Sequence, residues 1–169
     1  MGTVYKIDGI GTRGNPSSAS PFELVNKERR LRFVRMFASH AITKGDLVAL
    51  DTSGTEPDNG YGNHVLKALA TAAERKIGLG VAAEDIASGE LGSIQVAGYC
   101  DFAKSDVSAT ANGDFLTVSG DEEGLLDLYV TEAAAGSTGG NQVPVAISLT
   151  EHSRDTAASV VYLLNPLNL

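Results

Sequence analysis

The sequence lacks several features that would point to a particular function. Among its 169 residues there is no tryptophan and only one cysteine, Cys100. A lone cysteine excludes an intrachain disulfide and a cysteine metal cluster. No apolar run approaches the roughly 20 residues that span a bilayer, and the start of the chain has no apolar signal-peptide core. We therefore expect a soluble, unexported protein with no membrane partner.

Catalytic and nucleotide-binding motifs are also scarce. The stretch Gly9–Gly14 matches G-x-G-x-x-G in letters. A dinucleotide site needs that turn between an apolar strand and a helix, whereas here no such strand precedes it and Asn15-Pro16 follows directly. Cys100 lies in the apolar run Val96–Cys100 and is expected to be a small buried side chain. We predict no cofactor.

Residues that bind metals or transfer protons are scattered along the chain. None of the three histidines stands at metal-ligand spacing from another; they are His40, His64 and His152. His152-Ser153 with Asp155 offers hydrolase residue types, but neighbouring strand residues point to opposite faces. The acidic turn Asp121–Gly124 lacks the ligand spacing of an EF-hand. We predict a protein without catalytic or metal-binding residues; a pocket that converges on His152 or Cys100 would favour an enzyme instead.

Charge divides the chain into two parts. The net charge is −8, but residues 1–41 carry a net +4 and residues 42–169 a net −12. An acidic body repels nucleic acid, so a nucleic-acid partner is disfavoured. The basic leader is expected to dock on an acidic surface, on phosphate, or on the protein's own body. The candidate contact residues are Arg13, Lys27, Arg29, Arg30, Arg32 and Arg35.

The first 41 residues have the pattern of an arm and a connector. Residues 1–20 are rich in Gly, Ser and Pro, which predicts an extended arm that is ordered only when bound. Ser20–Glu23 matches a capping box and predicts a short helix at about 21–29. From residue 30, arginines alternate with apolar residues, which predicts a half-buried strand with Leu31 and Phe33 on its buried face.

Beyond residue 42 the pattern is β-rich. Short apolar runs separated by turn residues are typical of a sandwich or a barrel. The expected strands are 46–50, 65–69, 77–82, 93–102, 114–118, 125–130, 143–149 and 160–164. Leu66–Ile77 consists of good helix formers, so a strand followed by a helical turn is expected there. We predict a mainly β fold, a compact antiparallel barrel or sandwich (42–169) with an extended N-terminal arm and connector (1–41) and at most one or two short helices.

A short motif recurs before three of the expected strands. Ile42–Val48 resembles Ile86–Gly92, and Thr110–Leu116 is a looser third copy. Each copy places a glycine and then an acid at a turn. Glycine adopts a positive φ without steric cost, and the acid can accept hydrogen bonds from neighbouring backbone N–H groups. We interpret these acids as parts of turns rather than as catalysts.

The order of these pieces resembles the small capsid decoration, or cement, proteins of tailed phages. The resembling pieces are "ITKGDLVAL", "VLKALATAAERKIGLGVAAEDIASGELGSIQVAGYCDF", "NGDFLTV" and "VPVAISLTE". Gly92–Gly98 fits the glycine-bounded strand of that family closely but imperfectly. The leader 1–41 is not covered, so its role rests on charge and composition alone.

The resemblance implies a non-enzymatic β-barrel or sandwich, commonly a homotrimer, on the outer surface of the virion. Such a protein, made in the host cytoplasm, clamps neighbouring major capsid subunits against internal DNA pressure. We hypothesise that residues 1–20 and the basic segment 27–35 form the clamp. The alternatives are a β-sandwich head or tail appendage that binds host glycans, which the small number of aromatic residues disfavours, and an internal head protein that contacts DNA.

Overall fold

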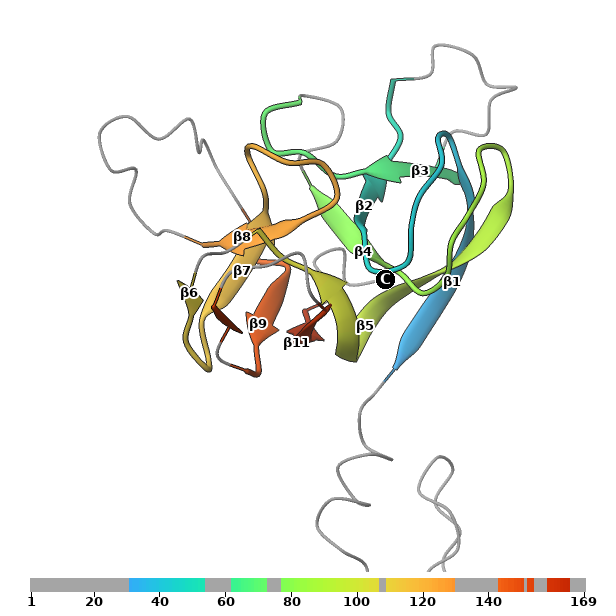
Figure 1. Ribbon diagram of the computed structural model, residues 1–169. Coiled ribbons are helices and arrows are strands. Elements are labelled where there is room, and N and C mark those ends of the chain that lie inside the picture. The colour runs from blue at the N-terminus through green and yellow to red at the C-terminus, as the bar shows by residue number, and fades with distance from the viewer. Residues whose placement is uncertain are drawn as a thin grey trace, which may run out of the picture. The chain divides into compact units, whose positions relative to one another are not determined.

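The computed structural model describes residues 31–53, 62–72, 77–106, 109–129, 143–150, 152–153 and 158–164. In these segments the chain forms eleven strands and no helix (Figure 1), which confirms the mainly β class. The described residues accordingly include no helix of the length and hydropathy needed to cross a bilayer. The arm at 1–20 and the helix expected at 21–29 lie outside the described residues.

Five strands close into a small barrel. They are β1 (Arg32–Ala38), β2 (Leu47–Leu50), β3 (His64–Lys67), β4 (Gly78–Ala82) and β5 (Leu91–Lys104). Their order is β1-β3-β2-β4-β5, and the barrel closes because β1 pairs with both β3 and β5. The β1–β3 pair is parallel, whereas the other barrel pairs are antiparallel, as expected from the sequence.

A second sheet continues from the barrel through β5. The first half of β5 pairs with β1, and its second half pairs with β11. The sheet then runs β11-β9-β7-β8. Its remaining strands are β7 (Phe115–Val118), β8 (Leu126–Leu128), β9 (Ala146–Ser148) and β11 (Ala158–Leu163). A separate ribbon pairs β6 (Ala109–Thr110) with β10 (His152–Ser153).

Each of the eight apolar runs beyond residue 42 overlaps a strand. The two strands of the small ribbon were not expected, because two residues are too few to show a period. In the segment Leu66–Ile77, β3 ends at Lys67, and the Ala72 N–H then donates to the Leu69 carbonyl at 3.1 Å. The expected strand is therefore present and one hydrogen-bonded turn follows it, but the described residues form no helix there, and residues 73–76 lie outside the described part.

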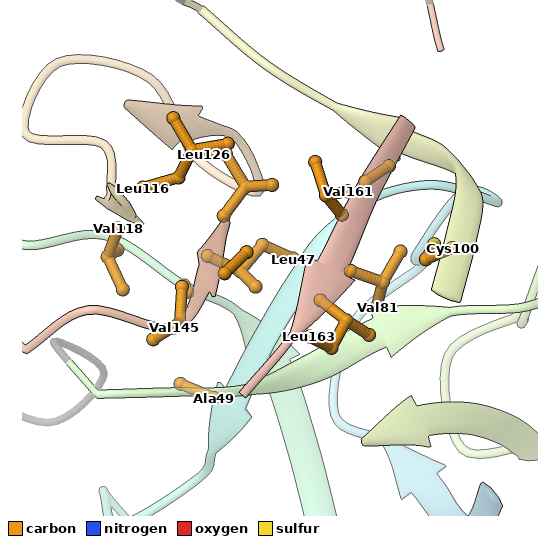
Figure 2. Close-up of a cluster of buried hydrophobic side chains, with 13 residues drawn as sticks. Leu47, Ala49, Val81, Cys100, Leu116, Val118, Leu126, Val145, Val161 and Leu163 are labelled. Carbon is orange, nitrogen blue, oxygen red and sulfur yellow. The ribbon is translucent and has the colours of Figure 1, made fainter. Parts of the chain in front are cut away.

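Two apolar cores fill the fold. The barrel core consists of Met36, Ala38, Ile42, Val48, Val65, Leu79, Ala82, Ile86, Ile94 and Val96. The second core lies between the barrel strands β2 and β4 and the second sheet, and Figure 2 shows its side chains gathered around Leu47. Neighbouring strand residues face opposite ways, so β2 directs Val48 into the barrel and Leu47 and Ala49 into the second core.

The repeated glycine-acid motif forms three similar turns. Gly45, Gly89 and Gly113 have φ values of 91°, 80° and 97°. In two copies the acid also accepts a backbone hydrogen bond, as expected. The Asp46 carboxylate accepts the Thr43 N–H at 2.9 Å, and the Asp114 carboxylate accepts the Ala111 N–H at 2.7 Å.

The first two copies of the motif also bind each other. Ile42 and Ile86 exchange backbone hydrogen bonds of 2.9 and 2.8 Å. The Gly45 N–H donates to Ala82, just as the Gly89 N–H donates to Ala38. This reciprocal pattern places the two turns symmetrically and fixes the end of β1 to the end of β4.

Candidate functional site

Strand β1 carries an exposed face that combines aromatic and basic side chains. Its residues Met36 and Ala38 point into the barrel core. The alternate residues Phe33, Arg35 and Phe37 face outward, with Phe33 47% and Phe37 39% exposed. The outward residues therefore lie on the side of β1 that does not pack against the barrel core.

This arrangement corrects the expected orientation of the strand. Leu31 and Phe33 were expected on a buried face, but they are 50% and 47% exposed. The strand begins only at Arg32, and its register with β5 shifts between Arg32 and Phe33. Met36, further along the strand, shows which face is buried. The alternation at residues 30–33 therefore predicted the wrong face.

Neighbouring strands extend the exposed face. Phe37 pairs with Leu91 of β5, which is 38% exposed. The Phe37 ring stacks on His64 of β3, with ring centroids 5.4 Å apart and an interplanar angle of 25°. We call Phe33, Arg35, Phe37 and Leu91 the β1 face. Its apolar members provide area for association, and Arg35 provides a positive charge at its centre.

Two of the six predicted contact residues belong to this region. Arg32 and Arg35 are exposed on β1, and neither forms an ion pair within the described part of the chain. The other four lie outside the described residues; they are Arg13, Lys27, Arg29 and Arg30. Leu91 and His64 could not be predicted as part of this region, because only strand pairing places them beside β1.

The acid of the first turn forms a buried ion-pair network. Asp46 is 2% exposed, and its carboxylate contacts Lys67 Nζ at 2.9 Å and Lys104 Nζ at 2.6 Å. Burial alone would raise the Asp46 pKa. Hydrogen bonds from Lys104, Thr43 and Lys67 outweigh burial and hold the pKa below its usual value. The network joins the start of β2 to the ends of β3 and β5, which is a structural role.

Cys100 occupies the second core, as predicted. It is 1% exposed, and burial raises the pKa of its thiol to about 11, an effect only partly offset by the Phe102 and Ala103 backbone N–H groups. A thiol with so high a pKa is protonated at neutral pH and is a poor nucleophile. Cys100 therefore packs as a small apolar side chain.

The histidines form no metal-binding cluster among the described residues, although His64 lies near Asp51. Burial alone would raise the pKa of that carboxyl, but hydrogen bonds from Ser39 and Ser53, helped by the charge of His64, hold the pKa below its usual value. His40 is exposed, and His64 is half-buried against Phe37. His152 and Ser153 form β10, and Asp155 lies outside the described residues. Among the residues that the structure describes, no group of three or more His, Cys, Asp or Glu side chains is placed to hold a metal ion.

Acidic side chains gather near β8. Burial raises the pKa of Asp127, and the charges of Asp106 and Asp121 raise it further, while a 2.6 Å hydrogen bond from the Leu128 N–H lowers it in part. The ionised form of Asp127 is therefore less favourable in the folded protein than in the unfolded chain. At neutral pH this carboxylate reduces the stability of the fold.

Asp127→Asn is expected to raise the free energy of unfolding by about 0.5 kcal/mol near pH 7, because it removes a charge and keeps an acceptor for Leu128. The gain should shrink as pH falls through the raised pKa, where the wild-type carboxyl becomes neutral. Urea unfolding at several pH values measures it. Asp101→Asn, at an exposed acid, is the control. A loss of stability in Asp127→Asn at neutral pH would contradict the interpretation.

Comparison with known proteins identifies the family. The family model described as phage cement protein matches residues 37–163, which include the last two residues of β1 and every later strand. No curated protein matches the chain. Among solved structures, the head fiber gp8.5 N base of bacteriophage phi29 aligns with a TM-score of 0.48 and 16% identity. The alignment covers 78% of this chain and 93% of that one, and at this score we draw nothing from it. The family match spans about three-quarters of the sequence, and the chain therefore belongs to the phage cement protein family.

Proposed function

We propose that the protein is a non-enzymatic capsid decoration protein. It binds the outer surface of a phage head and stabilises contacts between major capsid subunits. The observation that carries this proposal is the match of residues 37–163 to the phage cement proteins. A decoration protein acts through shape and contact area. Its function therefore requires no reactive group, and the buried, protonated Cys100 is compatible with that role.

The β1 face is the proposed contact with the capsid. Aromatic and arginine side chains supply most of the binding energy in protein interfaces, and Phe33, Phe37 and Arg35 provide both types on one strand. Arg32 and Arg35 of β1 favour a partner surface that carries acidic residues. Arg13, Lys27, Arg29 and Arg30 would extend this contact, and residues 1–20 would clamp onto the shell.

We propose that the protein acts as a homotrimer. Three linked copies convert weak single contacts into strong overall binding, because each later contact forms at a high effective concentration. Such multivalency suits the modest size of the β1 face, which one strand and its neighbours provide.

A glycan-binding appendage is the second candidate function, because one row of side chains favours it. Tyr162 of β11 pairs with Tyr99 of β5 and with Ile147 of β9, and Ile147 pairs with Phe115 of β7. Paired residues share a face, so three aromatic rings lie in one row across the second sheet. Aromatic rows of this kind can stack on sugars. Glycan-array binding that is lost in Phe115→Ser would favour this function.

The capsid contact is tested by comparing two phenylalanines of matched exposure. Phe33 is 47% exposed on β1, and Phe115 is 48% exposed on the second sheet. Phe33→Ser should weaken binding to shells of the major capsid protein by roughly ten-fold or more, as expected for an aromatic side chain in an interface. Phe115→Ser should bind like the wild type. Co-sedimentation with shells measures both, and equal binding by the two variants would contradict the proposed contact.

A further inference from the structure

One edge of β1 is open along most of the strand. On one side, β5 pairs with β1 from Arg32 to Phe37. On the other side, β3 pairs only with Phe37 and Ala38 (Figure 1). Residues 32–36 therefore have a partner strand on one side only, within the part of the chain that the structure describes.

The hydrogen bonds at the end of β1 show which backbone groups face the open edge. The Phe37 and Ser39 N–H groups donate to β3 and the residue before it, each at 2.9 Å, whereas the Ala38 N–H donates to Glu90 beside β5 at 3.0 Å. Backbone groups alternate sides along a strand. Phe33 and Arg35 therefore direct their N–H and C=O groups away from β5, along the line of β3.

An open row of N–H and C=O groups is a template for another strand. The two outward-directed residues offer up to four backbone hydrogen bonds. A strand added here would extend the line of β3. Its outward side chains would lie beside Phe33 and Arg35, and its inward side chains would lie beside Val34 and Met36 at the barrel core.

The charge of the β1 arginines indicates which kind of strand can pair with this edge. If two copies paired edge to edge through β1 in the register that centres on Arg35, the two Arg35 side chains would lie side by side, and like charges across paired strands are destabilising. An acidic residue beside Arg35 would be favourable instead. An apolar β-branched residue on the inward side would contact Val34 and Met36.

We propose that an extended segment of a major capsid subunit, about five residues long and with an acidic residue on its outward face, adds as a strand to the open edge of β1. This inference rests on the proposed capsid-binding function. It specifies that the main chain provides affinity and that Arg35 and the barrel core provide selectivity. The β1 face then packs against the capsid beside the added strand.

Two substitutions at Arg35 distinguish binding through the backbone from binding through the side chain. Arg35→Ala removes the charge and keeps the N–H that faces the open edge. Arg35→Pro also removes that N–H and places a ring in the path of an added strand. Proline is tolerated on edge strands, and the bonds to β5 come from the alternate residues. In co-sedimentation with shells of the major capsid protein, Arg35→Pro is expected to bind about ten-fold more weakly than Arg35→Ala.

Amide hydrogen exchange of the wild-type protein provides a second measurement that does not depend on how the variants fold. On shell binding, the Phe33 and Arg35 amides should become protected. Equal binding by the two variants, with both amides exchanging alike in free and bound protein, would overturn strand addition while capsid binding stands. If the Phe33 and Arg35 amides became protected by self-association without shells, the added strand would come from a second copy, and the proposal of a capsid segment would be overturned. A wild-type protein that does not bind shells would overturn both the proposed function and this inference.

Discussion

Gly45→Ala is expected to lower the free energy of unfolding by about 4 kcal/mol, or to prevent folding. Gly45 has a φ of 91°, a region that other residues rarely adopt. A Cβ atom there would also lie 2.3 Å from the Phe102 carbonyl oxygen. That oxygen belongs to β5, and the Lys104 N–H donates to the Gly45 carbonyl at 3.0 Å. Neither backbone can move away without breaking the contact between the first turn and β5. Urea unfolding followed by circular dichroism measures the loss.

Gly89→Ala is the matched control, because Gly89 occupies the corresponding position of the second turn. Its φ is 80°, but a Cβ atom there would meet nothing within 4 Å. The substitution should therefore cost only the strain of the left-handed backbone, about 1 kcal/mol. The difference between the two variants isolates the close approach to Phe102. If Gly89→Ala and Gly45→Ala lost equal stability, close packing at the first turn would not explain the effect.

The comparison of these glycines illustrates which features of the fold are visible in the sequence. The positive φ of Gly45, Gly89 and Gly113 follows from a glycine before an acid at a turn. The proximity of Gly45 to Phe102 does not follow, because it depends on how β5 passes the first turn. Local chemistry predicted the turns and most strands, whereas the contacts between distant segments depend on barrel closure.

Barrel closure also explains the wrong orientation of β1. The alternation of arginine and apolar residues is a local signal, and it placed Phe33 on the buried face. The barrel instead buries Met36 and Ala38, which leaves Phe33 and Phe37 outside. In β2 the sequence showed only a continuous apolar run, since both faces of this strand are buried. Which core each residue enters is decided by the second sheet.

Only part of the candidate site could be predicted from the sequence, because the rest depends on barrel closure. The basic character of Arg32 and Arg35 was visible in the sequence, and both are exposed on β1. Leu91 is distant in sequence, so only the β1–β5 pairing shows that it belongs to the same face. The open edge was not predictable either, because it depends on β3 pairing with only the last two residues of β1.

Asp46→Asn is expected to lower the free energy of unfolding by about 3 kcal/mol near pH 7. The substitution leaves Lys67 and Lys104 without the carboxylate that both contact. The side chains of these lysines are 29% and 27% exposed, so solvent compensates in part, and the loss should lie at the low end for a broken buried pair. Urea unfolding near neutral pH measures this effect.

The same residue gives the fold an acid-sensitive contribution. The folded-state pKa of Asp46 lies below its usual value of 3.8, so the unfolded chain takes up this proton first as pH falls. The stabilisation is therefore fully present well above 3.8 and is lost as pH falls through the folded-state pKa. Asp46→Asn should remove this dependence, so the stabilities of wild type and variant should converge once the pH falls below the folded-state pKa of Asp46.

Asp114→Asn is the control that distinguishes the lysine contacts from the turn itself. Asp114 caps its turn as Asp46 does, through the Ala111 N–H at 2.7 Å, but it forms no ion pair within the described residues. Asp114→Asn should lower the free energy of unfolding by less than about 1 kcal/mol, the contribution of a single exposed hydrogen bond. If both variants lost the same stability, the cap alone would account for the effect. A larger loss at Asp46 that disappears in acid would instead assign the difference to the two lysines that join β3 and β5 to the first turn.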